Sequence, residues 1–375
     1  MAVKVALIML LFTRLIVCRK TKQFYCNKFV LFIIFLIILK GILWLIYGMF
    51  HGNPLPKIQS LFPFNCLWPL LYLSLILNIS SKQVFHYLCA IILYTHVFIV
   101  VYNLYALFSV FMGIEPIAFF ESEANFIASE VGYGISNPSL QQLVFTTPFF
   151  FTIMITGNLR IFNRFWAGLI FLMTVTVMIL SSRGIMILSL GILPLIPLGM
   201  KIISKRIKYN FTKFYTSLFV LIAISSVYVF NSEIFEDLVK PLVEKFDEND
   251  DAIRFSQREM LIDIWKEHPF IGNGYGTVYF DSIRGTHDAV ESMYHADLAN
   301  TGLIGFLIFA IYILLIFYKA IKVYTFSNDI MVFACITGLF FYLLASATNP
   351  FLASFDRMYP IYFTLAAINV YTKKQ

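Results

Sequence analysis

Long apolar segments separated by polar loops run along most of this 375-residue chain. Ten of them have the length and composition of membrane-spanning helices: 29–50, 62–79, 84–105, 143–158, 166–182, 184–203, 215–231, 298–318, 330–347 and 358–372. About 20 mostly apolar residues cross a bilayer as a helix, which satisfies every backbone polar group within the segment. Residues 2–17 form either an eleventh span or a short interfacial helix. The pattern predicts an all-α, polytopic membrane protein with about 10–11 transmembrane helices.

Composition supports this fold class. Hydrophobic residues make up 59% of the chain, and its mean hydropathy is +0.80. Soluble domains are about 45–50% apolar, so a soluble domain of this length is excluded. None of the five cysteines lies between residues 231 and 297. A disulfide framework or a thiolate zinc site is therefore not expected in that polar region.

Basic residues gather in alternate loops. They fall in 18–28 and 201–213, and at Lys82, Arg160, Arg164, Lys319, Lys322, Lys373 and Lys374. The positive-inside rule places these loops and the C-terminus in the cytoplasm. The other loops, 231–297 included, then lie on the extracytoplasmic, periplasmic side. We expect residues 1–375 to form a single integral membrane domain that contains this large loop.

The 231–297 loop concentrates the charged residues of the chain. It holds 15 of the 21 acidic residues and three of the six histidines, but only 6 of the 28 lysines and arginines. Within it, 255–268 has the spacing of an amphipathic helix. Its predicted apolar face consists of Met260, Leu261, Ile264 and Trp265, and its predicted solvent face of Glu259, Asp263 and Lys266. We expect this helix to lie over the membrane surface and cover a cavity.

A tight turn follows this helix. Pro269 ends the helix, and the glycine-rich residues 272–276 can bring the backbone close to a ligand.

Three residues are candidates for chemistry. Arg183 lies in the 181–184 turn, where an arginine near lipid is costly unless it faces a cavity or an anion; the alternative is snorkelling to the interface. Arg258 lies on the polar side of the predicted helix, where a solvated salt bridge is the alternative, with Asp263 or Glu259. His295 precedes the 298–318 span by one turn, a position at which most histidines are surface or capping residues.

Three motifs carry a family resemblance. The run from Arg258 through Trp265 and His268-Pro269 to Gly272 and Gly274 resembles the R…W…HP-x-x-G-x-G signature of bacterial O-antigen polymerases (Wzy-type) and O-antigen ligases. Residues 295–305 are similar to the family's H-x-x-L-x-x-x-G-hydrophobic-hydrophobic-G pattern, and residues 182–184 resemble its SRG turn. The motifs occur in the family's order, and the first half of the chain shows no matching motif.

The resemblance implies polymerisation of a surface polysaccharide at the outer face of the bacterial inner membrane. The donor would be an oligosaccharide linked to undecaprenyl diphosphate, and the acceptor a sugar hydroxyl. By motif position, Arg183 and Arg258 would bind the diphosphate, and His295 would be the general base. Guanidinium groups stabilise a diphosphate without a metal, and a neutral histidine accepts protons near pH 7. We expect no cofactor, no metal and no nucleic acid; the expected partners are the lipid-linked oligosaccharide, the bilayer and a chain-length regulator protein.

Three alternatives stay open. An O-antigen ligase would use the same motifs but transfer the glycan to lipid A–core. A metal-dependent glycosyltransferase would hold its cation on Glu121 and Glu123, and loss of activity on EDTA treatment would favour it. A flippase for the same lipid would need an inverted repeat and mid-membrane ionisable groups. No Asp or Glu lies inside a predicted span, and Lys40, the main charge there, is expected to snorkel.

Overall fold

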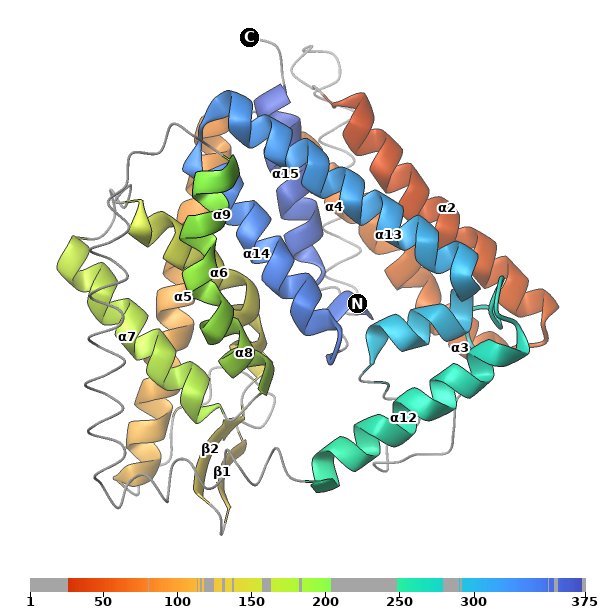
Figure 1. Cartoon of the computed structure of the whole chain (residues 1–375), viewed down its shortest axis with the longest axis horizontal. Helices are drawn as coiled ribbons and strands as arrows, with labels where there is room; N and C mark the ends of the chain where they lie inside the picture. Colours follow the sequence, from red (N-terminus) through yellow and green to blue (C-terminus); the bar gives the residue numbers. More distant parts are fainter. Residues whose placement is uncertain are drawn as a thin grey trace. The chain divides into compact units, whose positions relative to one another are not determined.

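The computed structural model is mostly helical and divides into two compact units, Met1–Leu88 with Ala252–Gln375, and Cys89–Asp251 (Figure 1). The structure describes residues 26–79, 81–112, 114, 117, 125–129, 132–136, 138–156, 163–181, 184–203, 248–278, 290, 292–349, 351–353 and 357–372.

The first unit is a helical bundle built around α13 (Met293–Ser327). This helix packs against α2 (Lys28–Phe50), α14 (Ile330–Ser346) and α15 (Tyr359–Thr372), as Figure 1 shows. The remaining elements of the unit are α3 (Leu55–Phe62), a π-helical turn (Pro63–Leu67), α4 (Trp68–Asn78), most of α12 (Glu248–Glu267) and a 3-10 turn (Phe351–Ala353). The helix interfaces are apolar, with Ile33, Leu71 and Leu365 among the fully buried side chains.

The second unit contains most of α5 (Lys82–Phe111), which enters it at Cys89. Its other helical elements are a 3-10 turn (Pro138–Gln142), α6 (Leu143–Ile155), α7 (Arg164–Leu180), α8 (Gly184–Ile192), a second 3-10 turn (Leu193–Leu195) and α9 (Ile196–Ile203). A short antiparallel hairpin, β1 (Asn125–Ser129) and β2 (Gly132–Ser136), was not predicted. The buried His96 ring lies between the hydroxyls of Thr146 and Thr174, at 3.0 and 3.1 Å.

The prediction of an all-α, polytopic membrane protein is confirmed. In the described part of the chain, five helices are long and apolar enough to cross a membrane: Lys28–Phe50, Leu55–Asn78, Lys82–Ser109, Gly184–Ile203 and Met293–Ser327. Three further apolar helices are shorter: Ser139–Ile155, Phe165–Leu180 and Ile330–Ser346. The predicted segments 2–17 and 215–231 lie outside the described residues. The orientation of the loops and of the C-terminus stays a prediction.

One irregularity of α13 positions the candidate site. Gly302 has φ 60° and ψ −170°, which breaks the helix near its start. The piece before the break, Met293–Thr301, contains His295, Asp297, Asn300 and other polar residues, whereas Leu303–Tyr318 is continuously apolar apart from Gly305. The apolar stretch after the break is therefore the part of α13 that can span a bilayer. Met293–Thr301 is not part of that stretch.

Candidate active site

The apolar face of α12 packs on the first piece of α13. Leu261 is fully buried in a cluster with Ala296 and Ala299, against which Ile264 and Trp265 also pack. The predicted solvent-facing residues are all exposed: Glu259, Asp263 and Lys266. The predicted faces of this helix are confirmed, with Met260 half-buried at the edge of the apolar face, whereas its position over the membrane and over a cavity stays a prediction. The helix begins earlier than predicted, at Glu248, because its first turns are too polar to show an apolar period.

The turn after α12 fills the break in α13. A broken helix leaves carbonyl and N–H groups without their intrahelical partners. The turn supplies them through four backbone hydrogen bonds of 2.8–3.0 Å: Asn273 N to Ala299 O, Gly274 N to Asn300 O, Leu303 N to Pro269 O, and Ile304 N to Phe270 O. The break and the turn are therefore one structural unit made from two sequence motifs.

The glycines of the turn allow backbone to touch backbone. Gly272 and Gly274 have φ of 76° and 78°. A Cβ on Gly272 would lie 2.4 Å from the Asn300 carbonyl oxygen, and one on Gly274 would lie 2.4 Å from the Cα of Gly48 in α2. In the structure the close neighbours of this turn are the backbones of α13 and α2, and its approach to a ligand stays a prediction.

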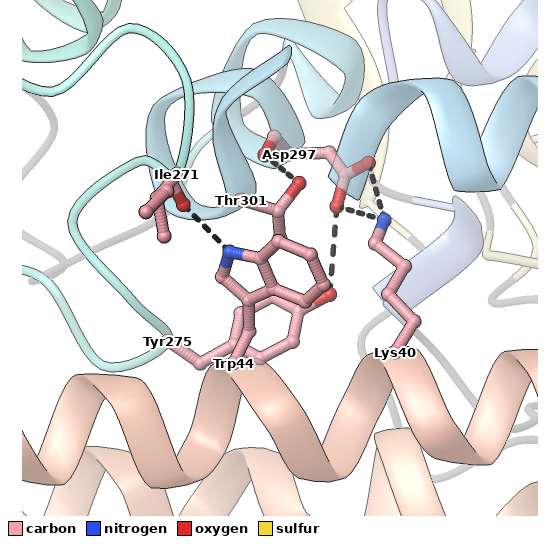
Figure 2. Close-up of polar contacts among 6 residues, drawn as sticks. All are labelled: Lys40, Trp44, Ile271, Tyr275, Asp297 and Thr301. Atoms are coloured by element: carbon pink, nitrogen blue, oxygen red, sulfur yellow. Dashed lines mark hydrogen bonds and ion pairs between the residues drawn. The ribbon is translucent and has the colours of Figure 1, made fainter. Parts of the chain in front are cut away.

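A buried ion pair joins α2 to the first piece of α13 (Figure 2). Lys40 Nζ lies 2.7 Å from both carboxylate oxygens of Asp297, and the two side chains are only 6% and 17% exposed. The Tyr275 hydroxyl donates to Asp297 at 3.4 Å, and Trp44 Nε1 donates to the Ile271 carbonyl at 2.6 Å. The expectation that Lys40 snorkels to the interface is wrong, because its charge is neutralised inside the protein by a partner 257 positions away.

His295 lies in the first turn of α13, half-buried, with Nδ1 2.7 Å from the hydroxyl of Ser292. Burial, and second the nearby charge of Arg258, lower the pKa of His295 below its usual value. Both effects disfavour the imidazolium, so the ring is neutral at pH 7. A neutral imidazole held at Nδ1 is the form that a general base requires.

Arg258 faces inward from α12. It lies three positions before the buried Leu261 and is itself half-buried, so its predicted place on the polar face is corrected. The predicted alternative, a salt bridge with Asp263 or Glu259, is absent from the described residues, in which Asp263 pairs with Lys266 at 2.8 Å. Arg258 Nε is buried and has no hydrogen-bond partner among the described residues. A buried donor without a partner is costly, which suits a group that binds an anion not part of the chain.

Arg258 thus lies close enough to His295 for its charge to lower the pKa of the imidazole. Arg183 lies outside the described residues, so its convergence with them stays a prediction. Glu121, Glu123 and His287 also lie outside them, and His268 is exposed, with its ring 5.0 Å from that of His51. Within the described ranges, no group of three or more His, Cys, Asp or Glu side chains could hold a metal ion. Metal-independent chemistry stays a prediction.

Sequence reasoning missed four polar residues around this site: Lys40, Ser292, Asp297 and Tyr275. One signal was present for Lys40, because a charge inside an apolar span is expensive and implies a partner. No pattern in the sequence identified Asp297, 257 positions away, as that partner. Ser292 and Tyr275 carried no comparable signal.

The O-antigen ligase family model matches residues 168–310, a range that contains Arg183, Arg258 and His295. This segment is therefore similar to the O-antigen ligase family. A search of the curated proteins finds no match. The matched segment includes both α12 and the first turns of α13.

Proposed function

We propose that this protein polymerises a surface polysaccharide at the outer face of the bacterial inner membrane, joining oligosaccharide repeats carried on undecaprenyl diphosphate. The proposal is supported by a half-buried arginine, whose Nε has no hydrogen-bond partner in the described part of the chain, and by a neutral histidine whose pKa its charge lowers. Glycosyl transfer from a diphosphate needs both groups: a cation for the leaving group and a base for the attacking hydroxyl. The 231–297 loop would be periplasmic and the C-terminus cytoplasmic.

In the proposed reaction, the acceptor hydroxyl oxygen attacks the anomeric carbon of the donor. The bond from that carbon to the diphosphate oxygen breaks, and undecaprenyl diphosphate leaves with the bonding electron pair. The hydroxyl proton moves to Nε2 of His295. Arg258 stabilises the charge of the diphosphate, and a guanidinium can do so through two parallel hydrogen bonds. No metal or cofactor is needed to balance these steps.

Ser292 has a positioning role in this scheme. Its hydroxyl lies 2.7 Å from Nδ1 of His295. When Nδ1 carries the proton and donates it to the serine oxygen, the lone pair is on Nε2, which is then free to accept the proton of the acceptor. Arg183, which the SRG motif pairs with Arg258, would supply a second cation to the diphosphate. A chain-length regulator protein would act with the polymerase.

An O-antigen ligase is the second candidate, favoured by the description of the matched family model. The two activities differ in the acceptor, which is another lipid-linked repeat or lipid A–core. The test is purified protein in liposomes with lipid-linked repeats, with or without lipid A–core. A ladder of polymer from the repeats alone supports the polymerase. Product that forms only with lipid A–core would identify a ligase, and absence of product with either would reject both proposals.

Arg258→Ala should raise the KM for the lipid-linked donor by about 10–100-fold, because a hydrogen bond to a charged group contributes about 1.5–3 kcal/mol. Arg258→Lys should recover only part of this loss, since an ammonium cannot form the two-pronged contact. Donor titration in liposomes measures both. The matched control is Lys266→Ala, which removes an exposed cation from the same helix and should leave the KM within about twofold. Equal effects of the two alanine variants would contradict the role of Arg258.

The pH dependence of kcat/KM should change when the charge of Arg258 is removed. A general base works only when neutral, so kcat/KM falls as pH drops through its pKa. Because burial and Arg258 lower the pKa of His295, this acidic limb should lie below pH 6.5. Arg258→Gln removes one of the two causes, so the limb should move to higher pH, while Lys266→Gln should leave it in place. Rate measurements from pH 4.5 to 8 test this, and a limb unmoved by Arg258→Gln would contradict the assignment.

A further inference from the structure

We propose that the Lys40–Asp297 ion pair is a positioning device that sets the rotation of Met293–Thr301 and thereby the place of His295. Its catalytic consequence rests on the proposed function, whereas its structural consequence does not. Lys40 and Asp297 act through this short helix and are not assigned a contact with substrate.

The ion pair lies where α2 and the glycine turn contact the short helix Met293–Thr301. Lys40 reaches both oxygens of Asp297 at 2.7 Å from α2, and the Tyr275 hydroxyl adds a bond from the glycine turn. Lys40 Nζ also lies 5.5 Å from the ring centroid of Phe309, in the part of α13 after the break. The ion pair therefore connects α2, the turn and both pieces of α13.

Stability alone does not explain a buried ion pair. Removing two charges from water costs several kcal/mol per ion, and apolar replacements of such pairs are often neutral or stabilising. Directional hydrogen bonds hold the two ends of the short helix, from the Tyr294 hydroxyl to the Leu343 carbonyl and from the glycine turn to the carbonyls of Ala299 and Asn300. Between these ends, Ala296 meets α12 through a small apolar side chain, a contact that is not specific in direction. A bidentate ion pair holds one rotation of the helix, which apolar contact does not.

Rotation matters because of where His295 lies. Asp297 follows it by two positions, which is about 200° around a helix axis. Asp297 faces Lys40 of α2, whereas the His295 ring contacts the hydroxyl of Ser292 through Nδ1. A rotation of about 20° would move a side-chain end some 6 Å from the axis by about 2 Å. Displacements of about 1 Å at a reacting group can cost about 100-fold in rate.

The principal variant is the double substitution Lys40→Met/Asp297→Asn, which removes both charges and leaves neither unpaired. We expect kcat to fall about 100-fold with the donor KM within about twofold, because Arg258 remains. The melting temperature should change little. The matched control is Asn27→Leu, which removes the side-chain hydrogen bond from Asn27 to Thr372 of α15 and the N-cap bond from Phe29 N to Asn27 at the start of α2. It should leave kcat within about twofold.

A second readout does not depend on activity. Leu261→Cys and Ala296→Cys, introduced into a chain with its five native cysteines replaced by alanine, place two thiols in the packed cluster between α12 and α13. Oxidative cross-linking in membranes then reports the rotation of the short helix. We expect the yield to fall at least about threefold with the double variant and to stay unchanged with Asn27→Leu.

A milder variant covers the case in which the double variant does not accumulate in the membrane. Asp297→Glu keeps the charge but lengthens the side chain by one methylene, so the short helix must shift to preserve the pair. We expect kcat to fall about tenfold with a smaller cross-link yield.

Unchanged kcat or unchanged cross-linking in the variant tested would overturn the proposal. If the wild-type protein forms no product from any lipid-linked donor, the proposed function fails, and cross-linking alone then decides whether the ion pair positions the helix.

Discussion

His295→Ala should abolish polymer formation while the protein still inserts into the membrane and still binds the lipid-linked donor. The variant removes the only group assigned to take the proton of the acceptor hydroxyl, and loss of a general base typically costs about 10²–10⁴-fold in rate. The donor KM should change little, because Arg258 stays in place. Polymer length on gels, in a strain that lacks the native protein, measures the effect, with expression checked by blot.

The chain offers a matched control. His268 lies in the same 231–297 segment but is exposed, and the structure gives it a ring contact with His51 and no place beside Arg258. His268→Ala should therefore leave polymer formation intact. Full-length polymer from the His295→Ala strain would remove this residue as the base. Loss in both variants would point to a requirement for the fold of the loop and not for one imidazole.

The apolar spans and the amphipathic face of α12 were predictable because each depends on a periodic pattern within one segment. Leu261 and Trp265 turn inward as their spacing indicates. The predicted face of Arg258 was wrong. It was assigned to the solvent face because it is a charged residue in a polar sequence, although it lies one turn from Leu261. The helical period therefore predicts the inward direction of Arg258, whereas its charge does not.

The break at Gly302 was not predictable in the same way. Both sides of it have helical sequence, and a single glycine is tolerated within helices. The break is stable because the turn of Gly272 and Gly274, some 30 positions earlier, supplies its missing hydrogen bonds. The Lys40–Asp297 pair depends on the same long-range arrangement, so pattern and spacing could suggest that Lys40 needs a partner but not which one.

The glycines of this turn allow a second test with a large expected effect. Gly274→Ala should prevent most of the protein from accumulating in folded form. Its φ of 78° costs a residue with a Cβ about 1–2 kcal/mol, and the added Cβ would lie 2.4 Å from Gly48 Cα and 2.5 Å from Gly48 N. Backbone atoms of α2 cannot move aside as a flexible side chain can, so overpacking should add about 1–3 kcal/mol or more.

Alanine substitutions at two other glycines distinguish the effect of backbone strain from that of a steric clash with neighbouring backbone. Gly52 has a similar φ of 85° but nothing within 4 Å of an added Cβ, so Gly52→Ala should cost only the strain, about 1–2 kcal/mol. Gly48 is helical, yet its Cβ would lie 2.2 Å from the Tyr275 carbonyl oxygen, so Gly48→Ala should behave like Gly274→Ala. Detergent-solubilised yield and melting temperature by size-exclusion chromatography measure all three. Mild, equal effects at the three positions would show that the turn does not dock on α2, because only close backbone contact makes Gly48 and Gly274 alike and Gly52 different.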